Sequence, residues 1–163
     1  MTGPERRDEV LTRIRLAELA VITGHAPGSD QLIRLGVEAL LAGVDSPTLA
    51  ELAGLTRAEE PEATALFRRV TDELGLNWDL PDDPAERNRA LLRLWSGMLL
   101  DGTLTPDDAA ERLYWPLYDL GPVDALTPLL TAVLLHEDGQ SASPHELTRD
   151  LVTQARKFLD SAA

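Results

Sequence analysis

Two groups of carboxylates in this sequence have spacings that can bind a divalent cation. The segment DDPAE, from Asp82 to Glu86, has a pattern with which some helical enzymes hold Mg²⁺ and a diphosphate, and AEEPEA places Glu59 and Glu62 around Glu60. A chain of 163 residues is too short for the large helical barrel that diphosphate chemistry needs. Both groups also lie at predicted helix starts, where a carboxylate stabilises free backbone N–H groups. We therefore interpret them as caps and keep a Mg²⁺-dependent carboxylate enzyme as the weaker alternative.

The three histidines have no spacing typical of a helical zinc site. His25, His136 and His145 contain no pair four residues apart and no HExxH motif. His136 with Glu137 and Asp138 could bind a metal together with His145, but placement at helix ends explains them more simply. The sequence also lacks a nucleophile elbow, a phosphate-binding loop and a dinucleotide fingerprint. We expect no catalytic residue, no metal and no cofactor.

An unusual aromatic group lies in the segment ERLYWPLYDLGP. The chain is only 4% aromatic, yet Tyr114, Trp115 and Tyr118 lie within five residues. Pro116 stands among them, inside a helix predicted over 106–120. Because proline has no N–H and crowds the preceding turn, we expect the helix to bend or break there.

Two interpretations of these rings are open. Trp115 points away from the apolar stripe of its helix, so we expect it to be partly exposed unless another helix covers it. In the structural interpretation, the rings fill the wedge that a kink at Pro116 opens. In the functional one, Tyr114, Trp115 and Tyr118 form a binding surface, since Trp and Tyr are favoured anchors. Trp95 adds an alternative in which an apolar cavity near Trp95 and Trp115 holds a small apolar ligand.

The composition limits the class of partner. The formal net charge is −13, with 28 acidic residues against 15 basic ones. Such a surface repels phosphate backbones and anionic lipids, so we expect no nucleic acid and no membrane as partner. Cysteine is absent, which excludes disulfides and thiol chemistry. The N-terminal residues have no apolar core of a signal peptide, and no apolar run is long enough to span a bilayer. We expect an acidic, cytoplasmic protein.

The first predicted helix carries the densest basic group of the chain. Four arginines lie among its first dozen residues: Arg6, Arg7, Arg13 and Arg15. An apolar stripe runs along the same helix through Val10, Ile14, Ala17 and Val21. This helix could dock on the acidic body of a second copy and form a homodimer, or it could pack within its own chain.

Regular start and stop signals predict an all-α fold. A cap residue precedes proline at Ser46, Asp83, Thr105 and Ser143, and glycines follow apolar periodic runs at 24, 43, 54, 75, 102, 121 and 139. These signals predict about eight helices, at 5–23, 30–42, 47–53, 58–74, 84–100, 106–120, 123–137 and 144–160. The seventh has an alternative start near 127. We expect a compact bundle of seven to eight short helices forming a single domain over 1–163, with a possible soft boundary near 77–84.

Three phrases of the chain resemble a loose group of uncharacterised all-helical proteins from actinobacteria. They are ALLAGVDSPTLAELAGL, EATALFRRVTDELGL and GTLTPDDAAERLYWPLYDLG, and the resemblance spans about residues 35 to 160. It implies an all-helical fold in a cytoplasmic actinobacterial protein and implies no mechanism. The missing catalytic and cofactor motifs favour a non-catalytic protein-interaction module, such as an adaptor, regulator or immunity-type partner. A small-molecule binding protein is the alternative.

Overall fold

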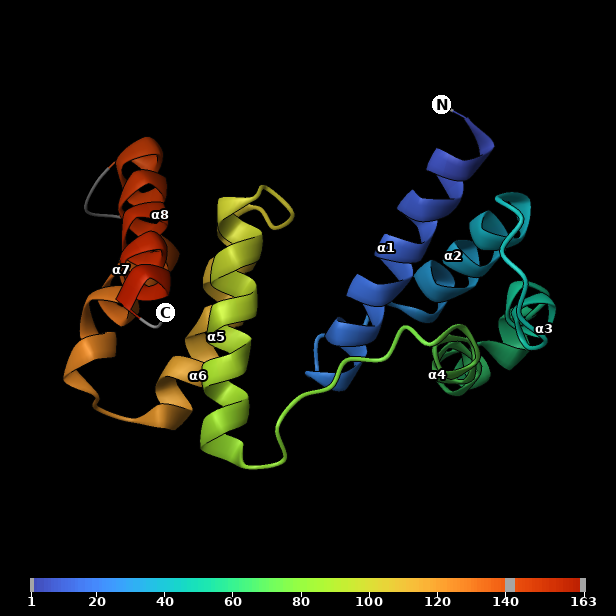
Figure 1. The fold of residues 1–163 in the computed structure, drawn as a ribbon, viewed down its shortest axis with the longest axis horizontal. Coiled ribbons are helices and arrows are strands. Elements are labelled where there is room, and N and C mark those ends of the chain that lie inside the picture. Colours follow the sequence, from blue (N-terminus) through green and yellow to red (C-terminus); the bar gives the residue numbers. More distant parts are fainter. Residues whose placement is uncertain (1, 140–142, 162–163) are drawn as a thin grey trace. The chain divides into compact units, whose positions relative to one another are not determined.

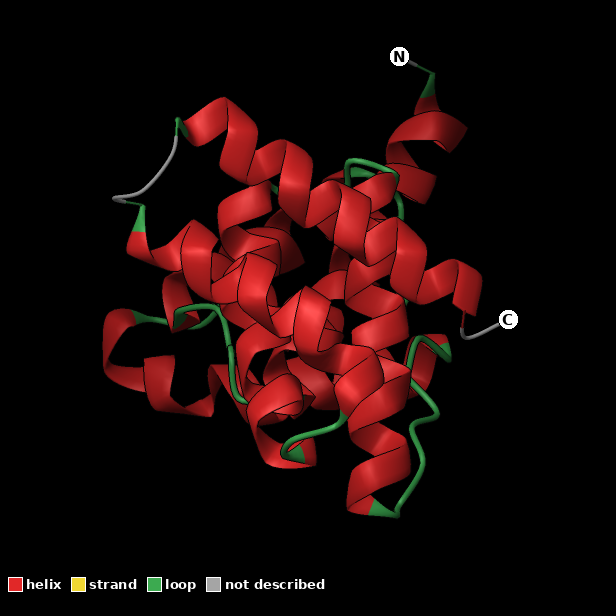
Figure 2. Ribbon diagram, turned by 90° about the vertical axis from the view of Figure 1, so that its left-hand side faces the viewer, coloured by secondary structure: helices red, strands yellow, loops and turns green. Residues whose placement is uncertain are grey.

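The computed structural model describes residues 2–139 and 143–161, which form helices joined by loops (Figure 2). Within these ranges there are eight α-helices and two short 3₁₀ helices. The predicted all-α fold class is confirmed, and so is the expected number of helices. No helix in the described ranges has the length and apolarity that crossing a bilayer requires.

Contacts within the chain divide it into two compact units, Met1–Asp79 and Leu80–Ala163. The division lies inside the segment 77–84, where the sequence placed a soft boundary. The stretch there is rich in proline and aspartate, which favour extended and turn conformations over helix. A single domain over 1–163 stays a prediction.

The first unit contains four α-helices around one apolar core (Figure 1). They are α1 (Gly3–Ile22), α2 (Ser29–Leu41), α3 (Leu49–Ala53) and α4 (Ala63–Leu74), and the 3₁₀ helix η1 (Arg57–Glu62) leads into α4. Helix α1 packs against α2 and α4, and α3 packs against the same two helices. The core is formed by apolar stripes, with Ile14 from α1, Leu32 from α2 and Phe67 from α4 almost fully buried.

The second unit contains α5 (Pro84–Leu100), α6 (Pro106–Leu120), α7 (Thr127–Asp138) and α8 (Pro144–Ser161). The short η2 (Asp124–Leu126) precedes α7, so this α-helix begins at the later of the two predicted starts. Helix α6 packs against α5, α7 and α8, and α8 also packs against α5 and α7. Leu113 and Leu117 are the most buried leucines of α6, and their stripe fixes which face of this helix meets its neighbours.

Three of the four predicted cap residues begin their helices as expected. The side chain of Asp83 accepts a hydrogen bond from Glu86 N at 3.0 Å, and Thr105 Oγ1 accepts one from Asp108 N at 3.2 Å. Ser143 Oγ accepts from Glu146 N, also at 3.2 Å. Each bond satisfies a backbone donor that a helix start leaves free.

The prediction for Ser46 is wrong. Helix α3 begins only at Leu49, and the Ser46 hydroxyl donates to the carboxylate of Glu73, on α4. The same carboxylate accepts from Thr48 Oγ1 and, at 3.0 Å, from Thr48 N. These hydrogen bonds, from Ser46 first, hold the pKa of Glu73 below its ordinary value. The backbone N–H at the start of α3 is thus capped by a side chain 25 residues away in the sequence, which no local pattern predicts.

All seven predicted glycine stops lie at the end of a helix or directly after its cap. Six of these glycines have a positive φ, which glycine adopts without strain, and Gly54 caps α3 with φ −92°. The expected break at Pro116 is not seen, because α6 continues as one helix through this residue to Leu120. Pro116 lies in the last turns of the helix and is buried beside Leu117, so packing offsets the one backbone hydrogen bond that proline cannot donate.

Thr105→Ala tests the cap on which α6 depends. Removing the hydroxyl leaves Asp108 N without its acceptor, so we expect the free energy of unfolding to fall by about 1 kcal/mol. Urea unfolding followed by far-UV circular dichroism measures it. Thr105→Ser keeps the hydroxyl and is the control. Equal stability of both variants would show that the cap contributes nothing.

Candidate functional site

The rings of Tyr114, Trp115 and Tyr118 form one contiguous group on α6, here called the aromatic cluster. The Tyr114 and Tyr118 rings are stacked, with centroids 6.0 Å apart and planes inclined by 18°. The Trp115 ring stands edge-on to both, with centroids 5.1 Å from Tyr114 and 6.0 Å from Tyr118. Offset and edge-to-face pairs are the arrangements that aromatic rings prefer, so each ring holds the others in place.

The aromatic cluster faces away from the core. Trp115 is 56% exposed and Tyr118 is 63% exposed, whereas Tyr114 is half-buried. Leu113 and Leu117 occupy the buried stripe, and Trp115 lies nearly opposite Leu113 on the helix. The expected exposure of Trp115 is confirmed. The rings of Trp115 and Tyr118 are exposed and do not fill a wedge inside the protein. Their positions follow from the helix alone and require no kink at Pro116.

Trp95 differs from the aromatic cluster in its surroundings. It comes from α5 and is buried, with only 2% of its surface exposed. It belongs to the buried stripe of that helix, together with Leu91, Leu92 and Leu99. A ligand role for Trp95 stays a prediction.

Three of the carboxylates and histidines with ligand-like spacings have structural partners. Asp83 caps α5, and Glu59 Oε2 accepts hydrogen bonds from Thr56 N at 2.9 Å and from Thr56 Oγ1 at 3.0 Å. His136 Nε2 lies 2.7 Å from Asp107 Oδ1, so this histidine of α7 contacts the first turn of α6. In the part of the chain that the structure describes, no three or more His, Asp or Glu side chains are grouped as a metal site.

A groove runs between α1 and α2, here called the α1–α2 groove. It consists of two adjoining pockets of about 390 and 380 Å³, which share Arg13 and Glu38 as lining residues. These two side chains form an ion pair across the groove. One pocket continues to Pro27 and Gln31, and the other to Arg6 and Leu41. The sequence predicts the basic side of α1 but not its pairing with α2, since Arg13 and Glu38 are 25 residues apart.

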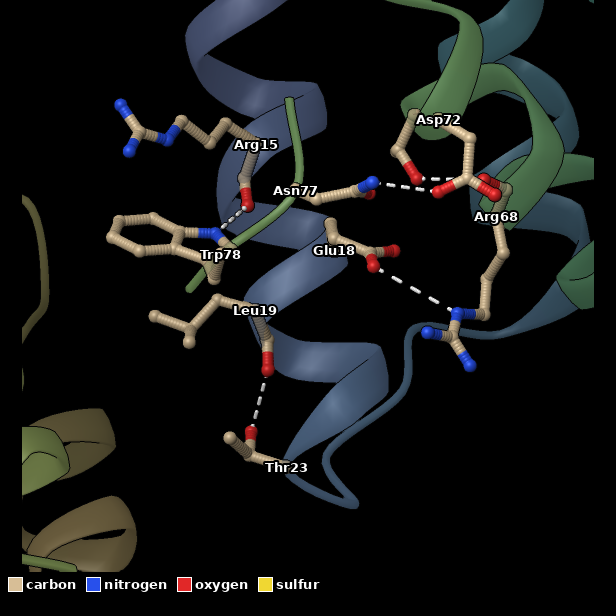
Figure 3. Close-up of polar contacts among 9 residues, drawn as sticks. Arg15, Glu18, Leu19, Thr23, Arg68, Asp72, Asn77 and Trp78 are labelled. Atoms are coloured by element: carbon tan, nitrogen blue, oxygen red, sulfur yellow. Dashed lines mark hydrogen bonds and ion pairs between the residues drawn. The ribbon is translucent and has the colours of Figure 1, made fainter. Parts of the chain in front are cut away.

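Trp78 fastens the end of the first unit to α1. Its Nε1 donates a hydrogen bond of 2.7 Å to the carbonyl oxygen of Arg15, and the Arg15 guanidinium lies 4.3 Å from the ring centroid (Figure 3). Asn77 Nδ2 donates to Asp72 Oδ1 at 2.6 Å, so the preceding residue is tied back to α4. Sequence reasoning missed this role because 77–84 reads as a linker. A tryptophan in a segment otherwise rich in Pro and Asp was the available signal.

Glu18 is the buried acid next to this contact. It lies on α1 facing α4, is only 2% exposed, and its Oε1 lies 3.7 Å from Arg68 Nε (Figure 3). Its other oxygen is buried and has no hydrogen-bond partner among the described residues. Burial raises the pKa of Glu18, the positive charge of Arg68 opposes this shift, and the negative charge of Asp72 adds to it.

Replacing Trp115 by alanine tests whether the aromatic cluster is dispensable for folding. Because Trp115 is mostly exposed, we expect the free energy of unfolding to fall by less than about 1 kcal/mol. Leu113→Ala, two residues away in the buried stripe, should cost about 2–5 kcal/mol. Chemical unfolding of both variants gives the comparison, and a loss at Trp115 as large as that at Leu113 would show a core role for the ring.

Glu18→Gln tests the buried acid through the pH dependence of stability. Because the native pKa is raised above the ordinary value of 4.5, the native state keeps a proton that the unfolded chain releases at lower pH. The stabilisation from this proton is complete below the ordinary pKa and is lost as pH rises through the raised one. We therefore expect the stability of the wild type, relative to Glu18→Gln, to fall as pH rises across this interval.

Urea unfolding at a series of pH values checks this expectation. Glu51→Gln, which changes an exposed glutamate on α3, is the control for the loss of one negative charge. A relative stability that is constant with pH, or that rises, contradicts a raised pKa at Glu18.

Comparisons of the chain with protein-family models, with curated proteins and with solved structures find no match. The resemblance to helical actinobacterial proteins therefore stays a prediction.

Proposed function

We propose that this protein is a non-catalytic interaction module that binds a protein partner through the aromatic cluster on α6. One observation carries the proposal: Trp115 and Tyr118 are more than half exposed while their rings remain in mutual contact. Contact between the apolar surface of a ring and water is unfavourable. A partner that covers the rings removes this surface from water, which contributes favourable free energy to binding. Trp and Tyr are also the residue types that contribute most at protein interfaces.

The rigidity of the aromatic cluster favours binding. A ring held by its neighbours loses little rotational freedom when a partner covers it, so less of the binding free energy is spent on ordering. The helix adds to this effect, because buried Leu113 and Leu117 fix the direction in which the rings point. The cluster is therefore suited to enter a preformed apolar pocket on the partner.

Acidic residues beside the rings indicate the chemistry of the partner. Glu111 and Asp119 lie one helical turn before and after Trp115, and both are exposed. A partner with an apolar pocket and Lys or Arg at its rim would match this surface, and its cations could also lie over the indole face. The net charge of −13 favours such a basic partner over a nucleic acid. A cytoplasmic location is part of this proposal, as an expectation from the sequence.

Site-specific photocrosslinking tests the proposal in the cells that produce the protein naturally. With p-benzoylphenylalanine in place of Asp119, beside the aromatic cluster, we expect one discrete covalent adduct on gels and in mass spectrometry. The same probe at Ala65, an exposed residue of α4, is the control and should give none. Adding Trp115→Ala to the Asp119 probe should remove the adduct by taking away the anchor.

The outcomes separate the alternatives. An adduct with twice the mass of the chain identifies a homodimer, and a different mass identifies another protein. No adduct at position 119, or one that persists at full yield with Trp115→Ala, contradicts binding through the aromatic cluster. A small apolar ligand stays the alternative in that case.

A further inference from the structure

The α1–α2 groove is long enough to hold a segment of helix. On α1 its lining extends from Arg6 to Ala17, and on α2 from Gln31 to Leu41. Since the rise per residue is about 1.5 Å, each stretch has a length of roughly 16 Å. About three turns of an α-helix have this length, and three turns present one complete apolar face.

Apolar side chains line the groove and one end of it. Val10, Leu32 and Leu35 are buried beneath it, and Leu41 lies at one end with 78% of its surface exposed. Val37 and Leu40, on the same helix as Leu41, are also exposed large hydrophobic residues. In α2, whose other apolar residues are buried or partly buried, these three side chains extend the apolar surface onto the outside of the unit.

The charges of the groove are opposite in sign to those of the chain as a whole. Its lining has three arginines, Arg6, Arg13 and Arg34, against the two acids Glu9 and Glu38. Arg13 is paired with Glu38. Within the described residues, Arg6 and Arg34 form no ion pair with a carboxylate, and each of them lines one of the two pockets. In a protein with a net charge of −13, this surface favours a negatively charged occupant.

We propose that the α1–α2 groove, on the first unit, binds an amphipathic, acidic helix of a partner protein. The apolar face of the partner helix covers Leu41 and the groove floor, and its flanking carboxylates pair with Arg6 and Arg34. On α6 of this chain the leucine stripe of Leu113 and Leu117 is buried, and the helix exposes only the rings of Trp115 and Tyr118, so a second copy offers there no helix with a free leucine face without unfolding. The occupant is therefore a different protein, recognised in the helix-in-groove manner.

A pair of designed helical peptides tests the proposal on the full-length protein. The acidic probe is a fluorescein-labelled, side-chain-stapled helix with leucines along one face and glutamates about eleven residues apart, a spacing that returns to the same face. The matched probe has lysines in place of those glutamates. We expect saturable binding of the acidic probe by fluorescence anisotropy, and at least about tenfold weaker binding of the lysine probe.

Variants of the protein locate the contact. Arg6→Gln with Arg34→Gln removes two exposed charges without reversing them, and should weaken binding of the acidic probe about tenfold. Arg57→Gln, an exposed arginine of the same unit outside the groove, is the matched control and should bind as the wild type does. Trp115→Ala should also bind as the wild type does, which keeps this proposal distinguishable from the one for α6.

Every other outcome overturns the proposal. Equal binding of both probes shows an apolar surface without charge selection, and no saturable binding shows that the groove does not accept a helix. Loss of binding with Trp115→Ala places the contact on α6. A dimer that native mass spectrometry finds at rising concentration, and that the double arginine variant dissociates, assigns the groove to a second copy.

Discussion

The burial of one apolar stripe on each short helix is the constraint on which the rest of this structure depends. Helices of this length are marginal in water by themselves, so they persist only where packing covers their apolar side. On α6 that side is defined by Leu113 and Leu117, and once it faces the core the rotation of the helix is fixed. Trp115 and Tyr118 must then point outward. Their exposure follows from the register of the leucines, and the proline between them has no part in it.

The same constraint explains what the sequence predicts well. Periodic leucines and local caps act within one helix, and the residues that begin α5, α6 and α8 are seen to do so through Asp83, Thr105 and Ser143. The predicted break at Pro116 is absent for a related reason. Helix propensity reflects the backbone hydrogen bond that proline cannot donate. In the fold, the burial of Pro116 beside Leu117 near the end of the helix offsets this loss.

Contacts between distant residues account for the rest of the fold and of the candidate sites. The hydroxyls of Ser46 and Thr48 bind Glu73 in place of their own helix, and Trp78 binds the backbone of Arg15 across 63 residues of sequence. The α1–α2 groove has the same origin, since neither the basic side of α1 nor the apolar end of α2 predicts that they meet. The composition shows that the protein is acidic as a whole. Only the packing of α1 on α2 shows that basic and apolar side chains lie next to each other in the groove.

The acids of this chain show how one residue type can indicate chemistry in a sequence and serve folding in a structure. Glu5, Glu59 and Asp83 each accept a hydrogen bond from a backbone N–H at a helix start, and Glu73 does so for α3 from a neighbouring helix. A carboxylate that accepts such bonds is stabilised in its charged form, as the lowered pKa values of Glu5, Glu59 and Glu73 show. Glu18 is the contrast, because burial between α1 and α4 raises its pKa, and the surrounding helices leave one of its oxygens without a donor among the described residues. Acids at helix starts therefore add stability through their charge. Glu18 does not, because the burial of its carboxyl group between α1 and α4 disfavours the charged form, and the apolar packing of these two helices offsets this cost.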